Sequence, residues 1–221
     1  MPVRKIPKNH LTVTGGFASR KNGRMESFES PLEKEYMLLL EFDDEVESFE
    51  EQPVTIPLPG VPRGYTPDIL IRFRPDADTG EIRPPELTEI KHSDDLRRNA
   101  EKYAPKFATA ERFAADKGWE FRIVTEQEIR TPRLANLKFL REYRNIDPEE
   151  DACAHIIATI QTAEDGMSLA VLLDRISSTD EERLYWLPII WHLVLWQVLR
   201  VDLDAKLNND SVLSLSENPC P

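Results

Sequence analysis

Three side chains typical of a divalent-metal nuclease stand in two segments that favour β-strands. Asp68 belongs to residues 65–73, and Glu89 and Lys91 belong to residues 86–91. Two carboxylates can hold a hard cation through oxygen ligands. A lysine beside them places a positive charge next to an attacking water and a phosphate. This set predicts hydrolysis of a phosphodiester bond with Mg²⁺, or Mn²⁺, as cofactor.

The elements that must position these residues are two paired strands. Residues 65–73 alternate, with Ile69, Ile71 and Phe73 on one face, and residues 75–80 read as a turn. The two segments should therefore form a hairpin that brings Asp68 beside the second strand. Glu89 and Lys91 are two residues apart, so they point to the same face. An edge-strand salt bridge among the three groups is the structural alternative.

Glu33 is a further candidate, on a helix that should begin at Ser30-Pro31 and run to about residue 40 or 42. Ser30-x-x-Glu33 fits a capping box, which is a purely structural role. However, a helical wheel places Glu33 inside the apolar arc, between Tyr36 and Met37, where a carboxylate needs a partner. We therefore predict Glu33, Asp68, Glu89 and Lys91 as catalytic, with the three carboxylates as metal ligands.

Composition indicates a globular chain. The 221 residues are 40% hydrophobic and 31% charged. No apolar run reaches the roughly 18 residues of a membrane span, and no signal peptide is visible. Cys153 and Cys220 lie far apart without metal-ligand spacing, so we expect free thiols in a reducing bacterial cytoplasm.

The net charge of −12 is unevenly distributed. Residues 1–30 carry six basic residues against two acidic ones, whereas residues 148–221 carry four against thirteen. We predict that residues 1–29 form an extended basic arm that contacts DNA, with a solvated tail as the alternative. The arm's candidate DNA-binding residues are Arg4, Lys5, Lys8, Arg20, Lys21 and Arg24. The acidic C-terminal part should meet a protein partner.

Residues 30–147 read as an α/β domain with the order helix, three strands, helix, strand, helix. Its first strand is expected at 51–58, and the helix at 94–117 should kink or split at Pro105. Residues 148–221 read as a second domain, with helices near 151–163, 168–176 and 182–199 and two extended segments at 201–207 and 211–215. That order is typical of a winged helix. The apolar stretch 185–199 should be its central core helix, and a partner-binding face is the alternative.

Several motifs in this order resemble the TnsA endonuclease of heteromeric transposases over roughly residues 17–145. They are Ser30-Pro31-Leu32-Glu33, Glu41-Phe42-Asp43, Phe49-Glu50-Glu51-Gln52-Pro53, Tyr65-Thr66-Pro67-Asp68-Ile69-Leu70, Glu89-Ile90-Lys91 and Gly118-Trp119-Glu120-Phe121. The resemblance implies a restriction-endonuclease-like mixed sheet flanked by helices, followed by a small winged-helix-like domain that engages partner subunits. It implies cleavage of the 5′ ends of a transposon by Glu33, Asp68 and Lys91, with Glu89 as a further metal ligand. The implied partners are transposon-end DNA, a TnsB-like transposase subunit and a TnsC-like ATPase.

Two other functions remain open on the sequence alone. One is a stand-alone nuclease of the same fold that serves restriction or repair. The other is a non-catalytic adaptor whose acidic surface docks a basic protein, although an intact set of Glu33, Asp68, Glu89 and Lys91 argues against it. His92, next to Lys91, either touches phosphate or is a solvated surface residue.

Overall fold

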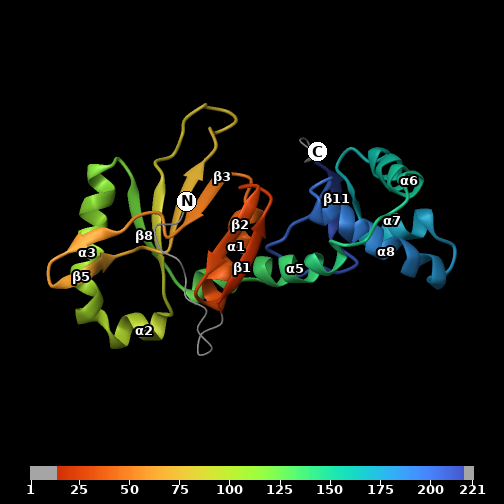
Figure 1. Ribbon diagram of the computed structural model, residues 1–221. Coiled ribbons are helices and arrows are strands. Elements are labelled where there is room, and N and C mark those ends of the chain that lie inside the picture. The colour runs from red at the N-terminus through yellow and green to blue at the C-terminus, as the bar shows by residue number, and fades with distance from the viewer. Residues whose placement is uncertain (1–13, 217–221) are drawn as a thin grey trace. The chain divides into compact units, whose positions relative to one another are not determined.

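The computed structural model describes residues 14–216, and the chain divides into two compact units (Figure 1). Unit 1 ends at Arg130, and unit 2 begins at Thr131. Within residues 14–216, no helix is long and apolar enough to cross a bilayer. The Cys153 thiol is free, whereas Cys220 lies outside the described residues.

Unit 1 is built on a four-stranded mixed sheet with the order β3-β6-β7-β8. Its strands are β3 (Val46–Glu51), β6 (Ile69–Phe73), β7 (Glu86–Ile90) and β8 (Glu120–Val124). The pairs β3–β6 and β6–β7 are antiparallel, as the predicted hairpin requires, and β7–β8 is parallel. With helices on both faces, this sheet confirms the predicted α/β class and is consistent with a restriction-endonuclease-like fold.

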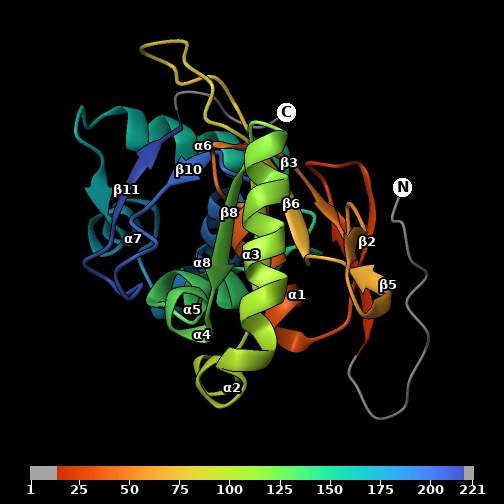
Figure 2. The same ribbon diagram turned by 90° about the vertical axis from the view of Figure 1, so that its left-hand side faces the viewer.

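Two helices cover the two faces of the sheet. Helix α3 (Ala100–Asp116) crosses one face, and α1 (Pro31–Glu41) lies on the other (Figure 2). On the α3 face, Leu70 and Leu87 pack with Ala110 and Ala114 of the helix. The small alanines let the helix approach the strands closely, and burial of this apolar surface stabilises the layer.

Helix α1 begins where the sequence predicts. Ser30 is the N-cap, its hydroxyl accepts from the Glu33 N–H at 3.2 Å, and Pro31 takes the first helical position. Proline suits that position because its missing N–H would have no partner inside the helix. Buried side chains, including Tyr36 and Met37, fix the helix against the sheet.

The prediction of an extended arm is wrong for residues 14–29. They form a hairpin of β1 (Gly15–Ser19) and β2 (Arg24–Phe28), with Gly23 in the left-handed region at φ 63°. The Asn22 side chain bonds both the N–H and the carbonyl of Phe49, so it attaches the hairpin to strand β3. Phe17 and Phe28 are buried. Contacts distant in sequence therefore order a segment that local composition presents as a tail.

Two further expectations for unit 1 are corrected. No single strand covers the residues 51–58 that were expected to form one. Strand β3 ends at Glu51, because Gln52 has φ 44° and Pro53 follows. A separate hairpin of β4 (Ile56–Leu58) and β5 (Val61–Tyr65) comes next. The helix at 94–117 splits at Asn99, between α2 (Ser93–Arg98) and α3, whereas Pro105 lies inside α3. A short helix, α4 (Glu126–Ile129), closes the unit.

Unit 2 has four α-helices and a small antiparallel sheet among its described residues. The elements are α5 (Pro132–Leu140), the 3₁₀ turn η1 (Arg141–Tyr143), α6 (Glu150–Gln161), β9 (Met167–Ser168), α7 (Leu169–Ile176), α8 (Asp180–Leu195), β10 (Leu199–Arg200) and β11 (Val212–Leu215). The strand order is β10-β11-β9. Strand β9 was not predicted. The extended segment expected at 201–207 contains no strand, because β10 (Leu199–Arg200) ends before it begins. The winged-helix assignment stays a prediction.

The boundary between the units lies earlier than the predicted 147/148. Helix α5 packs in unit 2, where Asn136 donates to the carbonyls of Leu203 and Ala205 at 2.8 and 2.7 Å. Phe139 meets Trp191 of α8 edge-on, with ring centroids 5.6 Å apart. The Asp147-Pro148 stretch that reads as a linker is thus a loop inside unit 2. Helix α8 is the predicted core helix, with Ile190 fully buried.

Candidate active site

Asp68, Glu89 and Lys91 converge where strand β6 begins and strand β7 ends. Asp68 immediately precedes β6, and its N–H donates to the Thr88 carbonyl at 3.1 Å. Its Oδ2 accepts the Ile90 N–H at 2.7 Å. The hairpin therefore brings the three residues together as the sequence predicts, at the carboxyl end of the parallel pair β7–β8.

Lys91 lies against both carboxylates. Its Nζ is 2.6 Å from Glu89 Oε1 and 3.5 Å from Asp68 Oδ2, and it donates to the Ile90 carbonyl at 3.0 Å. The salt bridge that the sequence offered as an alternative is thus present. These contacts hold the Lys91 cation beside the buried Glu89 and the partly buried Asp68, and a catalytic role of the three residues stays a prediction.

Tyr65 is a site residue that the sequence analysis missed. Its hydroxyl donates to Glu89 Oε2 at 2.8 Å, and its side chain is buried. A buried tyrosine usually finds a partner for its O–H. That rule, applied to a tyrosine three residues before Asp68, is the signal that would have indicated it. Both oxygens of Glu89 are thus bonded, one to Tyr65 and one to Lys91.

Glu33 takes part in the cap of α1, although its carboxylate bonds the Glu29 N–H and the Ser30 hydroxyl and not the Ser30 N–H of a capping box. Its Oε2 accepts the Glu29 N–H at 2.8 Å, and its Oε1 accepts from the Ser30 hydroxyl at 2.9 Å. Glu33 is also close enough to Asp68 for repulsion between the two carboxylates to raise its pKa. Glu33 therefore stabilises the first turn of α1 and lies near Asp68, and its catalytic role stays a prediction.

Burial and mutual repulsion make the three acids reluctant to ionise. Burial, then the charge of Asp68, raises the pKa of Glu33 and that of Glu89 to about 7 each. Burial also raises the pKa of Asp68, against the attraction of Lys91. Burial would lower the pKa of Lys91, but Asp68 and Glu89 raise it. Because these pKa values lie near 7, Glu33 and Glu89 are only partly ionised at neutral pH, while Lys91 keeps its positive charge.

The carboxylates do not form a ready-made metal cage. Among residues 14–216, no three His, Cys, Asp or Glu side chains are grouped so as to hold an ion. Lys91 instead contacts two of the acids. Asp68 Oδ1 nevertheless accepts no hydrogen bond from the described residues, and three acids with raised pKa values provide the hard oxygen donors that Mg²⁺ prefers.

The basic residues predicted to bind DNA are only partly described. Arg4, Lys5 and Lys8 lie outside the described residues. Lys21 donates to the carbonyls of Asp43 and Val46, the latter at 2.7 Å, and Arg24 pairs with Glu26 at 2.7 Å. The Arg20 N–H donates to Glu41 at 2.8 Å. The bonds of Lys21 and Arg20 fasten the hairpin to the rest of unit 1, whereas the Arg24–Glu26 pair lies within β2. DNA contact by the six residues stays a prediction.

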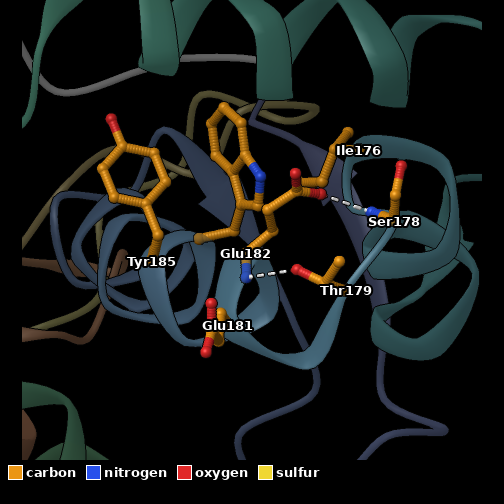
Figure 3. A pocket seen from close by; sticks show the side chains of 7 residues that line it. Ile176, Ser178, Thr179, Glu181, Glu182 and Tyr185 are labelled. Atoms are coloured by element: carbon orange, nitrogen blue, oxygen red, sulfur yellow. Dashed lines mark hydrogen bonds between the residues drawn. The ribbon is translucent and has the colours of Figure 1, made fainter.

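Two other features lie outside the carboxylate group. The Nδ1 of His92 is 3.5 Å from Glu126 Oε2, a surface contact in unit 1. In unit 2, a pocket at the α7–α8 junction is lined by residues that include Tyr185 and Glu182. Figure 3 shows that the Ser178 N–H donates to the Glu182 carboxylate and that the Glu182 N–H donates to the Thr179 hydroxyl. Neither feature brings together the acids and the cation found at Asp68.

Comparison with protein-family models gives two successive matches. The "TnsA-like endonuclease N terminal" model matches residues 43–126, which include Asp68, Glu89 and Lys91. The "TnsA endonuclease C terminal" model matches residues 128–203, and its start lies close to the start of unit 2 at Thr131. A search of curated proteins gave no match. Because both domains of one family follow each other in order, over most of the chain, this protein belongs to the TnsA-like endonucleases.

Proposed function

We propose that this protein is the metal-dependent DNA endonuclease subunit of a heteromeric transposase and cleaves the 5′ ends of the transposon in cut-and-paste transposition. The observation that carries the proposal is the convergence of Asp68, Glu89 and Lys91 at the end of β7, with Glu33 facing them from α1. A non-catalytic adaptor has no need for three acids shielded from solvent in which Asp68 raises the pKa of both Glu33 and Glu89.

Glu33, Asp68 and Glu89 are the residues that would hold Mg²⁺ or Mn²⁺. The bound ion would polarise the phosphate and make its water a stronger nucleophile. Asp68 offers Oδ1, while its Oδ2 is fixed by the Ile90 N–H. Glu89 is oriented by Tyr65, and Glu33 by the cap of α1. The chain thus presents pre-positioned donors on strand ends and a helix start.

Lys91 has the role of the cation beside the reacting phosphate. The Ile90 carbonyl and Glu89 hold its Nζ at 3.0 and 2.6 Å. A charge fixed in this way stabilises the negative charge that develops on the phosphate without reorganising during the reaction. The raised pKa of Lys91 keeps it protonated over the neutral range, so it orients water and stabilises charge but does not act as a base.

The proposed partners are transposon-end DNA, a TnsB-like subunit and a TnsC-like ATPase. Unit 2 is acidic, and the whole chain has a net charge of −12. This negative charge opposes tight binding of DNA, which is a polyanion, by the isolated chain. A DNA-bound partner would supply the local concentration that the chain lacks. We place the partner contact in unit 2, with its proposed winged-helix-like arrangement.

The test is cleavage of labelled transposon ends by the reconstituted complex, with Asp68→Ala and Lys91→Ala as variants and Asp116→Ala, at the exposed end of α3, as control. We expect each site variant to lose about 10²-fold or more in rate and the control to lose little. Mapping the ends of the DNA products shows which strand is cleaved. Near-normal cleavage by either folded site variant would refute the site.

A further inference from the structure

The first half of helix α3 lies beside the carboxylate group. Leu87 packs against α3, and Glu89 and Lys91 follow it on the same face of β7. The charges of Lys91 and Glu89 act on Tyr103, and Lys106 lies over the ring of Tyr65, whose hydroxyl bonds Glu89. The surface of α3 around Tyr103 and Lys106 is therefore continuous with the site.

Two lysines of this surface have no acidic partner. Lys102 and Lys106 are one helical turn apart on one side of α3, and neither makes a salt bridge within residues 14–216. Both ammonium groups lie near the Tyr103 ring, at 5.8 and 5.9 Å from its centroid. The result is an aromatic ring between two cations that the protein itself does not neutralise.

The neighbouring acids are already engaged or face elsewhere. Asp95 accepts from Tyr103 at 2.6 Å and from Asn99 at 2.7 Å, and Asp94 pairs with Arg97. Glu101 is turned about 100° around the helix from Lys102. Tyr103 and Asn99 are neutral donors, so Asp95 keeps its charge beside the patch, but it forms no salt bridge with Lys102 or Lys106 among residues 14–216.

We propose that Lys102, Tyr103 and Lys106 form the surface that binds the sugar–phosphate backbone of DNA next to the bond being cut. Lysines recognise phosphates as point charges, and an aromatic ring packs against sugars or exposed bases. This inference rests on the proposed nuclease function, and it places DNA contacts on α3, beyond those predicted for residues 1–29. The α3 surface of unit 1 would thus bind the DNA phosphates that neighbour the reacting phosphate.

Lys117 provides a matched control on the same segment of chain. It follows α3, is exposed, and lies over the Phe113 ring at 5.8 Å, so it repeats the lysine–aromatic contact. It is about 16 Å from Lys106 along the helix. Strand β8 begins shortly after Lys117. Its first residue, Glu120, lies opposite Glu86, the first residue of β7, so Lys117 is near the end of β7 that is remote from Lys91.

The experiment measures binding of a labelled DNA duplex by the full chain, without metal so that no cleavage occurs, over a range of salt. Each phosphate contact contributes about 0.9 to the slope of log affinity against log salt. Lys102→Gln with Lys106→Gln should lower the slope by about 1.8, whereas Lys117→Gln should leave it unchanged. Lys102→Arg with Lys106→Arg keeps both charges and should keep the wild-type slope. Equal slopes for the double variant and the Lys117 control would overturn the proposal.

A second measurement needs no variant. Acylation of lysine amines in the wild-type chain, followed by mass spectrometry, should show Lys102 and Lys106 protected by the duplex and Lys117 not protected. Protection of Lys117 alone, or of none of the three, would contradict the surface. Both measurements are independent of catalysis, so loss of the surface and failure of the nuclease assignment give different results.

Discussion

Replacing Glu33 by glutamine should stabilise unit 1 at alkaline pH while removing cleavage. The carboxylate is held in the first turn of α1 and faces Asp68, so its ionised form is unfavourable in the folded protein. Glutamine keeps the length of the side chain and one acceptor oxygen, but it has no charge to repel Asp68 or to attract a metal. Function and stability should therefore change in opposite directions.

The magnitude follows from the pKa of Glu33, which rises from 4.5 to about 7 on folding. Below pH 4.5 the Glu33 carboxyl is protonated in the folded and the unfolded state, so it does not lower the free energy of unfolding. As the pH rises to about 7 the carboxyl ionises more readily in the unfolded state, and the free energy of unfolding falls. At 1.36 kcal/mol per unit the full cost is about 3 kcal/mol at most. Losing one of the bonds from Glu29 and Ser30 costs about 1 kcal/mol. The net gain is about 2 kcal/mol above pH 7.

The assay is urea unfolding of the full chain near pH 8 and near pH 4 in the absence of divalent metal, followed by hydrogen exchange of β6 and β7. Hydrogen exchange of the β6 and β7 amides measures the stability of unit 1 by itself. This separate measurement is needed because a chain of two units need not unfold in one step. Glu35→Gln is the control, since Glu35 lies on the same helix in an ion pair with Arg130 at 2.8 Å. A Glu33→Gln variant that is equally destabilised at both pH values would show that only the cap contacts matter and would refute the argument.

Three further predictions concern other contacts. Tyr65→Phe removes a donor that lowers the pKa of Glu89, so the pH–rate profile of cleavage should shift to higher pH; an unchanged profile would contradict this role. Asn22→Ala should cost about 1–3 kcal/mol and speed hydrogen exchange in the β1–β2 hairpin, because the Phe49 backbone loses its partner. A chain that ends at Arg130 should stay monomeric and folded by circular dichroism and gel filtration, whereas one that ends at residue 147 should aggregate by exposing α5; the reverse order would place the boundary later.

The central hairpin could be predicted because its determinants are local. Alternation in β6, a turn of Asp and Gly, and the two-residue spacing of Glu89 and Lys91 suffice to bring Asp68 beside them. The start of α1 is likewise encoded in adjacent residues, Ser30 and Pro31. In both cases the physical rule acts over a few residues, so a single sequence contains the whole argument.

The errors arose where distant contacts decide. Residues 14–29 look like a polar tail until Asn22 meets the Phe49 backbone and Lys21 meets Val46. The unit boundary looks like a linker at Pro148, but Asn136 and Phe139 pack within unit 2. Neither partner can be identified from local composition, because each lies tens of residues away along the chain and only the fold brings them together.

Glu33 shows why a sequence pattern cannot always separate a structural role from a catalytic one. A glutamate at the third position of a helix reaches back to the chain before it, and here it accepts the Glu29 N–H and bonds Ser30. Those bonds fix the carboxylate in the one place where α1 begins, which is also the place that faces Asp68. The positive end of the helix favours its ionised form, while burial and Asp68 oppose it. The cap bonds thus hold a second acid near Asp68 without an ion pair, so the Ser30-x-x-Glu33 spacing is compatible with the structural role and with the proposed catalytic one.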